Sequence, residues 1–220
     1  MIIAIDGPAG AGKSTVAKKV AENLNFTYLD TGAMYRAFTL LVLEKNIPLD
    51  NLKEIEKLLN NFNIEYRGEK VFLNGKDVTK KIRSDEVTKN VSYISSLGFI
   101  RKKMVELQRN IGKNNNIVIE GRDIGTVVFP NADIKIYLDA SVEERAKRRL
   151  KDEKDSSQGT TLEEMIEKIK KRDEYDSNRQ IAPLKKANDA FYIDSTKMSI
   201  DDVCNIIIEL VRKSNKNSNI

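Results

Sequence analysis

The feature that most constrains the fold of this chain is a glycine-rich segment close to its start. Residues 7–14 read Gly-Pro-Ala-Gly-Ala-Gly-Lys-Ser, a complete G-x-x-x-x-G-K-S phosphate-binding loop (P-loop). An apolar run (2–5) precedes the segment and a helical pattern follows it, which is the strand–loop–helix context that this motif requires. A glycine-rich turn that binds nothing is the weaker alternative in that context. The segment therefore predicts a nucleoside triphosphate site.

Each part of this loop has a chemical task. Its glycines permit positive φ and bring backbone N–H groups close to phosphate oxygens. Lys13 can reach the β- and γ-phosphates, Ser14 can bind Mg²⁺, and the helix N-terminus adds its positive end. The expected triphosphate-binding residues are Gly7, Pro8, Ala9, Gly10, Ala11, Gly12, Lys13, Ser14 and Thr15.

Composition fits a compact cytoplasmic enzyme. Of the 220 residues, 40% are hydrophobic and 32% are charged, which is ordinary for a globular protein. The net charge of +5 favours polyanionic partners without choosing between nucleotides and nucleic acid. The single Cys204 excludes an internal disulfide, fits a reducing compartment, and lies on an apolar helix face typical of a core thiol. We see neither a signal peptide nor an apolar run of membrane-spanning length.

Predicted strands and helices alternate along much of the chain, which favours an α/β fold with a parallel sheet between helical layers. The predicted strands are 2–6, 26–29, 116–120, 134–138 and 191–193. The predicted helices are 13–24, 32–45 and 199–213, the last with Ser199 as its N-cap.

Two stretches break this alternation. Residues 60–80 predict a small antiparallel unit with an Asn74-Gly75 turn, inside a mostly helical insertion over 33–112. Residues 151–160 are charged and lack an apolar period, so they form either a solvated loop or, as we favour, a mobile lid. The expected organisation is one domain over 1–220, with a core of 1–32, 113–150 and 161–220.

Arginines cluster where elements end. Arg36 follows the second strand by about one helical turn, and Arg122 with Asp123 follows the strand 116–120. Ligands of open parallel sheets bind outside the carboxyl ends of strands, so both positions should face the P-loop. Arg172, Asp176 and Arg179 have i, i+4, i+7 spacing and should share one helix face. That trio is either a surface ion pair or, together with the other arginines, a site for a second phosphate.

Absent residue types narrow the chemistry. The chain has no histidine, which excludes an imidazole base, and no Asn-Lys-x-Asp motif for guanine. A sugar or shikimate kinase must deprotonate a hydroxyl, whereas a phosphate acceptor is already nucleophilic at neutral pH. Many arginines without an obvious base therefore favour a nucleoside monophosphate kinase or a near relative.

Five ordered blocks carry a family resemblance, at residues 5–14, 30–36, 120–130, 135–149 and 172–184. On these blocks the chain resembles the bacterial cytidylate kinases over essentially its whole length. The insertion near 60–80 resembles their extended monophosphate-binding domain, which shorter UMP/CMP kinases lack. The resemblance implies a P-loop three-layer α/β/α fold with a five-stranded parallel sheet, a monophosphate-binding insertion and a short lid. Glu120 stands where some members have Asp, and Thr31 where some have Ser.

The resemblance also implies roles for matching residues. Arg36, Arg122 and Arg179 would bind the acceptor phosphate, and Arg172 would bridge it to the transferred group. Thr31 and Asp176 would hold the ribose, while Ser92, Arg101 and Asp123 would recognise the cytosine edge. Arg148, on the ATP side, and Arg149 would donate to the transferring phosphoryl group, unless they simply form a solvated basic helix. The implied catalytic residues are Lys13, Arg122, Arg149, Arg172 and Arg179.

The expected function is Mg²⁺- and ATP-dependent phosphorylation of CMP and dCMP to CDP and dCDP, by direct transfer without a protein general base. A P-loop nucleic-acid-binding ATPase or switch is the alternative from another class, supported by the basic helix 145–151. Against it, we find no aromatic stacking platform. A nearer alternative is the same scaffold with a preference for UMP or AMP. We expect a monomer with neither nucleic-acid nor membrane partners.

Overall fold

The computed structural model describes residues 1–113, 115–152 and 159–217 of the chain. Within these ranges, no helix combines the length and the apolar character needed to cross a bilayer. The chain divides into two compact units. We call Met1–Leu29 with Ile111–Ile220 the core unit, and Asp30–Asn110 the inserted unit. The functional division expected from the sequence stays a prediction, and residues 153–158 of the expected lid lie outside the described residues.

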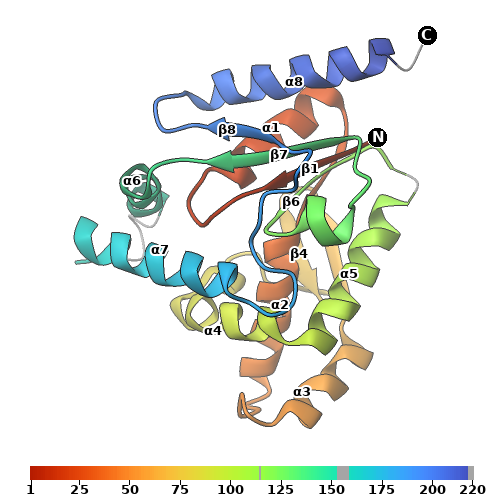
Figure 1. Ribbon diagram of the computed structural model, residues 1–220. Helices are drawn as coiled ribbons and strands as arrows, with labels where there is room; N and C mark the ends of the chain where they lie inside the picture. Colours follow the sequence, from red (N-terminus) through yellow and green to blue (C-terminus); the bar gives the residue numbers. More distant parts are fainter. Residues whose placement is uncertain (114, 153–158, 218–220) are drawn as a thin grey trace. The chain divides into compact units, whose positions relative to one another are not determined.

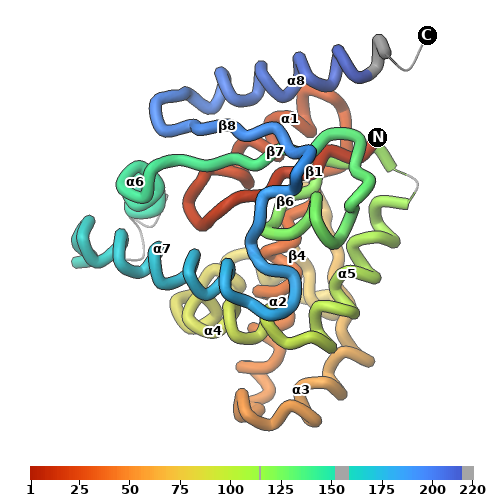
Figure 2. The backbone as a smooth tube through the Cα atoms, viewed as in Figure 1, coloured from red at the N-terminus to blue at the C-terminus, as the bar shows by residue number. Residues whose placement is uncertain are grey.

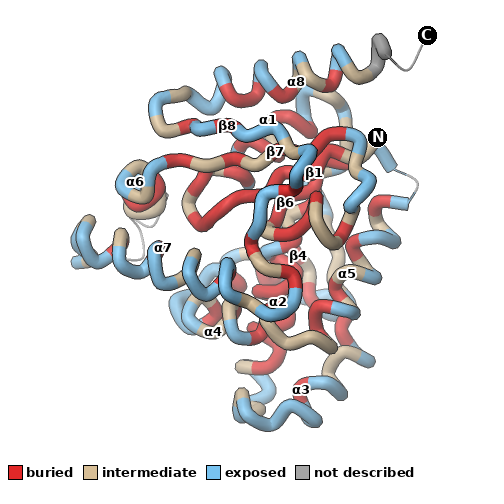
Figure 3. Tube along the Cα trace, in the orientation of Figure 1, coloured by how far each residue is buried: buried red, intermediate tan, exposed pale blue. Residues whose placement is uncertain are grey.

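A five-stranded sheet forms the centre of the core unit (Figure 1). Its strand order is β2 (Thr27–Asp30), β6 (Ile117–Gly121), β1 (Ile2–Asp6), β7 (Ile134–Asp139) and β8 (Phe191–Asp194). The central strand β1 pairs in parallel with both neighbours, so that Ile5 lies opposite Glu120 on one side and Ile136 on the other. Continuous apolar runs form the three inner strands β6, β1 and β7 because both of their faces are covered, and Figure 3 shows these three strands buried along most of their length. The predicted parallel sheet is confirmed.

Helices α1 (Lys13–Leu24) and α8 (Ile200–Asn217) cover one face of this sheet. Val16 and Val20 of α1 pack with Val203, Cys204 and Ile207 of α8 in a core that also includes β1 and β7. Cys204 is a buried core thiol, as predicted. The predicted N-cap is also confirmed, because the Ser199 hydroxyl accepts from the Asp202 N–H at 3.1 Å.

Helices α6 (Val142–Asp152) and α7 (Leu162–Ser177) pack together beside the sheet (Figure 2). Ala146, Met165 and Ile169 form a small apolar core between them. A capping box at Thr161 and Glu164 starts α7. A π-helical turn, Ile124–Val128, follows β6 in the same unit.

The inserted unit is mostly helical and contains a three-stranded antiparallel sheet. Its elements are α2 (Thr31–Glu44), α3 (Leu52–Leu58), a 3₁₀ turn (Leu59–Asn61), β3 (Ile64–Arg67), β4 (Lys70–Leu73), β5 (Lys76–Asp77), a 3₁₀ turn (Lys81–Arg83), α4 (Asp85–Ser96) and α5 (Gly98–Gly112), whose end passes into the core unit. Asn74 and Gly75 turn β4 into β5 with φ values of 48° and 78°. The predicted hairpin is therefore confirmed, since a two-residue turn of this type needs positive φ at both positions.

One sequence prediction is wrong. Arg179 does not share a helix face with Arg172 and Asp176, because α7 ends at Ser177. The Asp176 carbonyl accepts from the Leu184 N–H at 2.8 Å, as the chain folds back past the end of the helix. Ser177 and Asn178 have low helix propensity, and the bond from Leu184 occupies the Asp176 carbonyl that a longer helix would pair with residue 180.

Candidate active site

The P-loop lies between β1 and α1, as the motif predicts. Gly7, Gly10 and Gly12 have φ values of 154°, 77° and 85°. A Cβ atom on Gly7 would lie 2.0 Å from the Leu138 carbonyl oxygen, so glycine is required there. Gly12 stands at the N-cap of α1 and offers no side chain to the first helical N–H groups. These groups are consequently available to an anion.

Lys13 is the buried lysine of this loop. Its ammonium donates to the Pro8 carbonyl at 2.8 Å. Burial and, after it, the nearby charge of Arg122 lower the pKa of Lys13 to about 7, while Glu120 acts in the opposite direction. Part of this shift comes from the repulsion of the neighbouring guanidinium groups of Arg122 and Arg172. A bound polyphosphate would offset that repulsion and favour the charged form of Lys13.

Ser14 is linked to the end of the neighbouring strand β6. Its hydroxyl donates to the Glu120 carboxylate, which also accepts from the Tyr28 hydroxyl at 3.2 Å. Glu120 is buried, whereas Ser14 is exposed. Sequence reasoning compared Glu120 with the family but gave it no role in the site. Its place at the end of a strand next to β1 is the signal that could have found it.

Around Asp176, the core unit brings together arginines that are far apart in the sequence. Arg122 Nε donates to Asp176 Oδ2 at 3.1 Å, and Arg179 Nη1 lies 3.9 Å from Oδ1. Arg179 Nε also donates to the Asp176 main-chain oxygen at 3.2 Å. Although Arg179 lies beyond the end of α7, the chain after this helix places Arg179 beside Asp176. We call Arg122, Arg172, Asp176 and Arg179 the arginine cluster.

Arg172 gives this cluster an excess of positive charge. Burial and the neighbouring Arg122 lower the pKa of Arg172 to about 10. In the described part of the chain, its buried Nε has no hydrogen-bond partner. Arg149 of α6 is half-buried, and its charge also acts to lower the pKa of Arg172. Such an excess favours an anion.

Asp123 stands between β6 and the π-helical turn, and Asp6 fixes the backbone that follows it. The Asp6 carboxylate accepts from the Ile124 and Gly125 N–H groups at 2.8 and 2.7 Å. Burial raises the pKa of Asp6 to about 6 although these hydrogen bonds oppose the shift. Asp123 is itself buried. The sequence gave Asp6 no role beyond ending an apolar run, so its support of this turn was missed.

Arg148 of α6 contacts the P-loop directly. Its Nη1 donates to the Ala11 carbonyl at 3.3 Å, and its Nη2 donates to the Ser195 carbonyl at 2.7 Å. Nε is held by Glu144 at 3.0 Å. These contacts place the predicted ATP-side arginine against the nucleotide loop.

Four further predicted residues, Thr31, Arg36, Ser92 and Arg101, belong to the inserted unit and are described within it. Thr31 begins α2. Buried Arg36 donates through Nη1 to the Ile82 carbonyl at 3.1 Å and to the Thr88 hydroxyl at 2.9 Å.

Arg101 Nη1 donates to the Ser95 carbonyl at 3.0 Å, and its guanidinium lies 5.5 Å from the centre of the Tyr35 ring. Ser92 stands on α4, one turn after Thr88. Sequence reasoning missed Thr88 because a threonine inside a helix carries no pattern of its own.

Known proteins are similar to this chain over almost its whole length. The family model described as cytidylate kinase matches residues 3–213. The chain is 50% identical over 213 residues to the cytidylate kinase of Fusobacterium nucleatum, covering 97% of this chain and 98% of the relative. It is 48% identical over 215 residues to that of Clostridioides difficile, covering 98% of each. A shikimate kinase structure from Bacteroides thetaiotaomicron shares the fold, with a TM-score of 0.52 at 15% identity, over 96% of this chain and 98% of that one.

Proposed function

The chain belongs to the cytidylate kinase family, and we propose that it transfers the γ-phosphoryl group of ATP to CMP and dCMP, giving ADP with CDP or dCDP. The arginine cluster of the core unit is the observation that carries this proposal. Arg122 and Arg172 belong to it, and their charges also act on Lys13 of the P-loop. One cation group can therefore bind a donor polyphosphate and a second phosphate near it.

The donor side of the reaction uses the P-loop. Backbone N–H groups of the loop, Lys13 and Arg148 would bind the phosphates of ATP. In the transfer, the bond between the γ-phosphorus and its bridging oxygen breaks, and a bond to an acceptor phosphate oxygen forms. The leaving ADP takes the electron pair of the broken bond. Lys13, Arg149 and Arg172 would balance the negative charge on the transferring group.

On the acceptor side, arginines would replace a general base. A monophosphate is largely ionised at neutral pH, so its oxygen attacks without prior loss of a proton. Arg36, Arg122 and Arg179 would hold this phosphate, and Thr31 with Asp176 would accept the ribose. Orientation and charge then supply the catalysis.

Recognition of cytosine would come from Ser92, Arg101 and Asp123. The Asp123 carboxylate can accept from the exocyclic amine, and Arg101 can donate to the carbonyl oxygen or the ring nitrogen. Arg36, Ser92 and Arg101 lie within the insertion over 33–112, which supports a monophosphate-binding role for that segment.

A divalent cation fits the Ser14–Glu120 pair. Mg²⁺ prefers oxygen ligands, and the contact between the exposed hydroxyl and the buried carboxylate offers both a ligand and a partner that orients it. Among the described residues, no group of three or more His, Cys, Asp or Glu side chains could hold a metal. Ser14 and the phosphates of ATP would together supply ligands for the ion, and the ion would neutralise phosphate charge.

The deciding experiment measures ADP release with Mg²⁺-ATP against CMP, dCMP, UMP, AMP, GMP and shikimate. We expect fast turnover with CMP and dCMP and little with the purine nucleotides. Activity confined to UMP or AMP would support a nucleoside monophosphate kinase but would reject the proposed roles of Ser92, Arg101 and Asp123. If none of these acceptors stimulated turnover, the result would favour the alternative function, a P-loop ATPase or switch that binds nucleic acid. A salt titration of DNA and RNA binding would test that alternative.

Two variants test the assigned sites. Arg122→Ala removes a charge-assisted bond worth ~1.5–3 kcal/mol, so kcat/KM for CMP should fall roughly 10- to 100-fold. Asp123→Ala should weaken the preference for CMP over UMP more than it weakens ATP binding. An unchanged preference would exclude Asp123 from base recognition.

A further inference from the structure

We propose that Arg145 and Asp173 form a positioning pair that holds the Ala9 peptide of the P-loop in register with the turn of α7 that carries Arg172 and Asp176. The inference rests on the proposed function, because that function assigns the donor to the P-loop and the acceptor to these α7 residues. Neither member of the pair was singled out as a site residue from the sequence.

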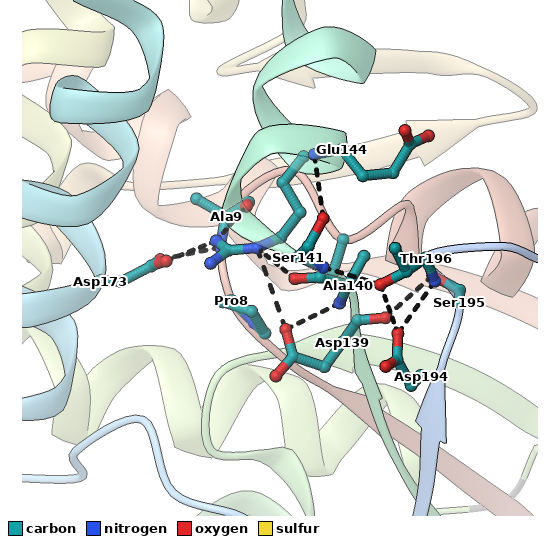
Figure 4. Close-up of polar contacts among 12 residues, drawn as sticks. Pro8, Ala9, Asp139, Ala140, Ser141, Glu144, Asp173, Asp194, Ser195 and Thr196 are labelled. Carbon is teal, nitrogen blue, oxygen red and sulfur yellow. Dashed lines mark hydrogen bonds and ion pairs between the residues drawn. The ribbon is translucent and has the colours of Figure 1, made fainter. Parts of the chain in front are cut away.

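The pair binds both polar main-chain groups of one loop residue. The Ala9 N–H donates to Asp173 Oδ1 at 3.0 Å, and both residues are labelled in Figure 4. Arg145 Nη1 donates to the Ala9 carbonyl at 2.9 Å. Arg145 Nη1 also donates to Asp173 Oδ2, so the two side chains that bind Ala9 are hydrogen-bonded to each other. Because Asp173 already accepts from its N–H, Ala9 would serve the loop as an anchor, in contrast to the phosphate contact expected for it from the sequence.

Arg145 is in turn fixed to the sheet. Its Nε donates to the Ala140 carbonyl at 2.9 Å and lies 3.9 Å from Asp139 Oδ1, both at the end of β7. The side chain of Arg145 is only 10% exposed. A Cβ atom on Gly10 would lie 2.9 Å from the Arg145 carbonyl oxygen, so the loop and α6 touch through their backbones. Arg145 is therefore a rigid support on which Asp173 can hold the loop.

Asp173 links this support to the acceptor side. It follows Arg172 directly and precedes Asp176 by one helical turn of α7. Its charge raises the pKa of Arg172, after the larger effects of burial and Arg122 that lower it. Phosphoryl transfer depends on the alignment of donor and acceptor, so a shift of the loop against this turn should slow the chemical step.

A purely structural pair would act differently. Helices α6 and α7 already pack through Ala146, Met165 and Ile169, so a structural pair would only add to their stability. A positioning pair should instead change kcat and ATP binding more than it changes the melting temperature. The two members should also depend on each other, because they act on one peptide.

The test is a double-mutant cycle in the full chain. Asp173→Asn keeps the shape of the side chain and removes its charge, and Arg145→Lys keeps the charge and removes the planar fork. Each variant and the double variant are assayed for kcat with CMP and for the affinity of a non-hydrolysable ATP analogue without acceptor. We expect each single variant to lose roughly 10- to 100-fold in kcat and to bind the analogue several-fold more weakly. The double variant should lose no more than about threefold beyond the worse single variant.

Lys170→Met is the matched control, because it breaks an exposed ion pair with Glu167 on the same helix. It should retain kcat and analogue affinity within about twofold. The proposal is overturned if both single variants retain kcat within twofold while their melting temperatures fall, or if their losses multiply in the double variant. If no acceptor stimulated turnover by the unmodified chain, the proposed function would be rejected instead. In that case, weaker binding of the ATP analogue by Asp173→Asn than by Lys170→Met would still support the pair.

Discussion

The P-loop and the arginine cluster are the two proposed anion sites of the core unit, and they depend on different physical features. In the P-loop, Gly7 and Gly10 have positive φ, and a Cβ atom on either would lie within 3 Å of a backbone oxygen, so the fit depends on space. In the arginine cluster, Arg122 and Arg179 contact the single carboxylate of Asp176, and the fit depends on charge. One added carbon should therefore damage the first region, and one removed charge should damage the second.

The largest expected effect is that of Gly7→Ala. The new Cβ atom would lie 2.0 Å from the Leu138 carbonyl oxygen in a backbone conformation that alanine avoids. Strain and overpacking together should lower the free energy of unfolding by about 4 kcal/mol or more, and ATP binding should be lost. Urea unfolding and nucleotide titration measure the two effects.

Gly75→Ala is the control for Gly7→Ala. Gly75 also has positive φ, but no heavy atom lies within 4 Å of its would-be Cβ. The cost there should be limited to about 1 kcal/mol of backbone strain. Equal losses in the two variants would contradict the view that space limits the P-loop.

The next effect in size is that of Asp176→Asn, which removes a charge at constant volume. Arg122 and Arg179 would lose their shared carboxylate, so the free energy of unfolding should fall by about 3 kcal/mol, and kcat/KM for CMP should fall more than that for ATP. Thermal unfolding and steady-state kinetics test both expectations. Asp201→Asn removes an exposed partner of Lys19 and should leave both quantities unchanged. If Asp176→Asn behaved like this control, the balance of charge would not govern the cluster.

Lys13 connects the two regions and gives a pH dependence of intermediate size. The pKa of Lys13, lowered to about 7 by burial and then by Arg122, leaves this lysine mostly neutral in the free protein above that pH. Bound phosphates favour the charged form, so ATP binding should take up about one proton at pH 8. The dissociation constant should rise up to about tenfold per pH unit above 7.

Calorimetry at pH 8, in two buffers of different ionisation enthalpy, counts this proton. Lys19→Met, on the same helix, should keep the uptake because the Lys19 side chain is exposed and pairs with Asp201. A binding reaction without proton uptake at pH 8 would mean that Lys13 stays charged in the free protein.

The smallest expected effect extends the comparison to the inserted unit. Thr88→Val removes the hydroxyl that accepts from Arg36 and leaves the bond to the Ile82 carbonyl. Loss of one such bond should raise KM for CMP roughly three- to tenfold with little change in KM for ATP. Thr88→Ser keeps a hydroxyl and should restore most of the affinity. Equal behaviour of the two variants would show that the hydroxyl does not hold Arg36.

Much of the fold could be predicted because its signals are local. The strands of the core unit are short apolar runs with turn residues beside them, and Asn74-Gly75 specifies its own turn. The end of α7 could not be predicted in this way. Its position depends on the hydrogen bond from Leu184 to Asp176, which no helical period reveals.

The sequence by itself determined the P-loop, the order of strands and helices along the chain, and the family, because these depend on residues that are neighbours in the chain. Only the tertiary structure decided which side chains support them. It brought Glu120 to Ser14, Asp6 to the turn after Asp123, and the Arg145–Asp173 pair to Ala9. These partners are separated by more than a hundred residues or lie on different helices. Their contact depends on strand order and helix packing, which follow from the burial of the whole core and not from any local pattern.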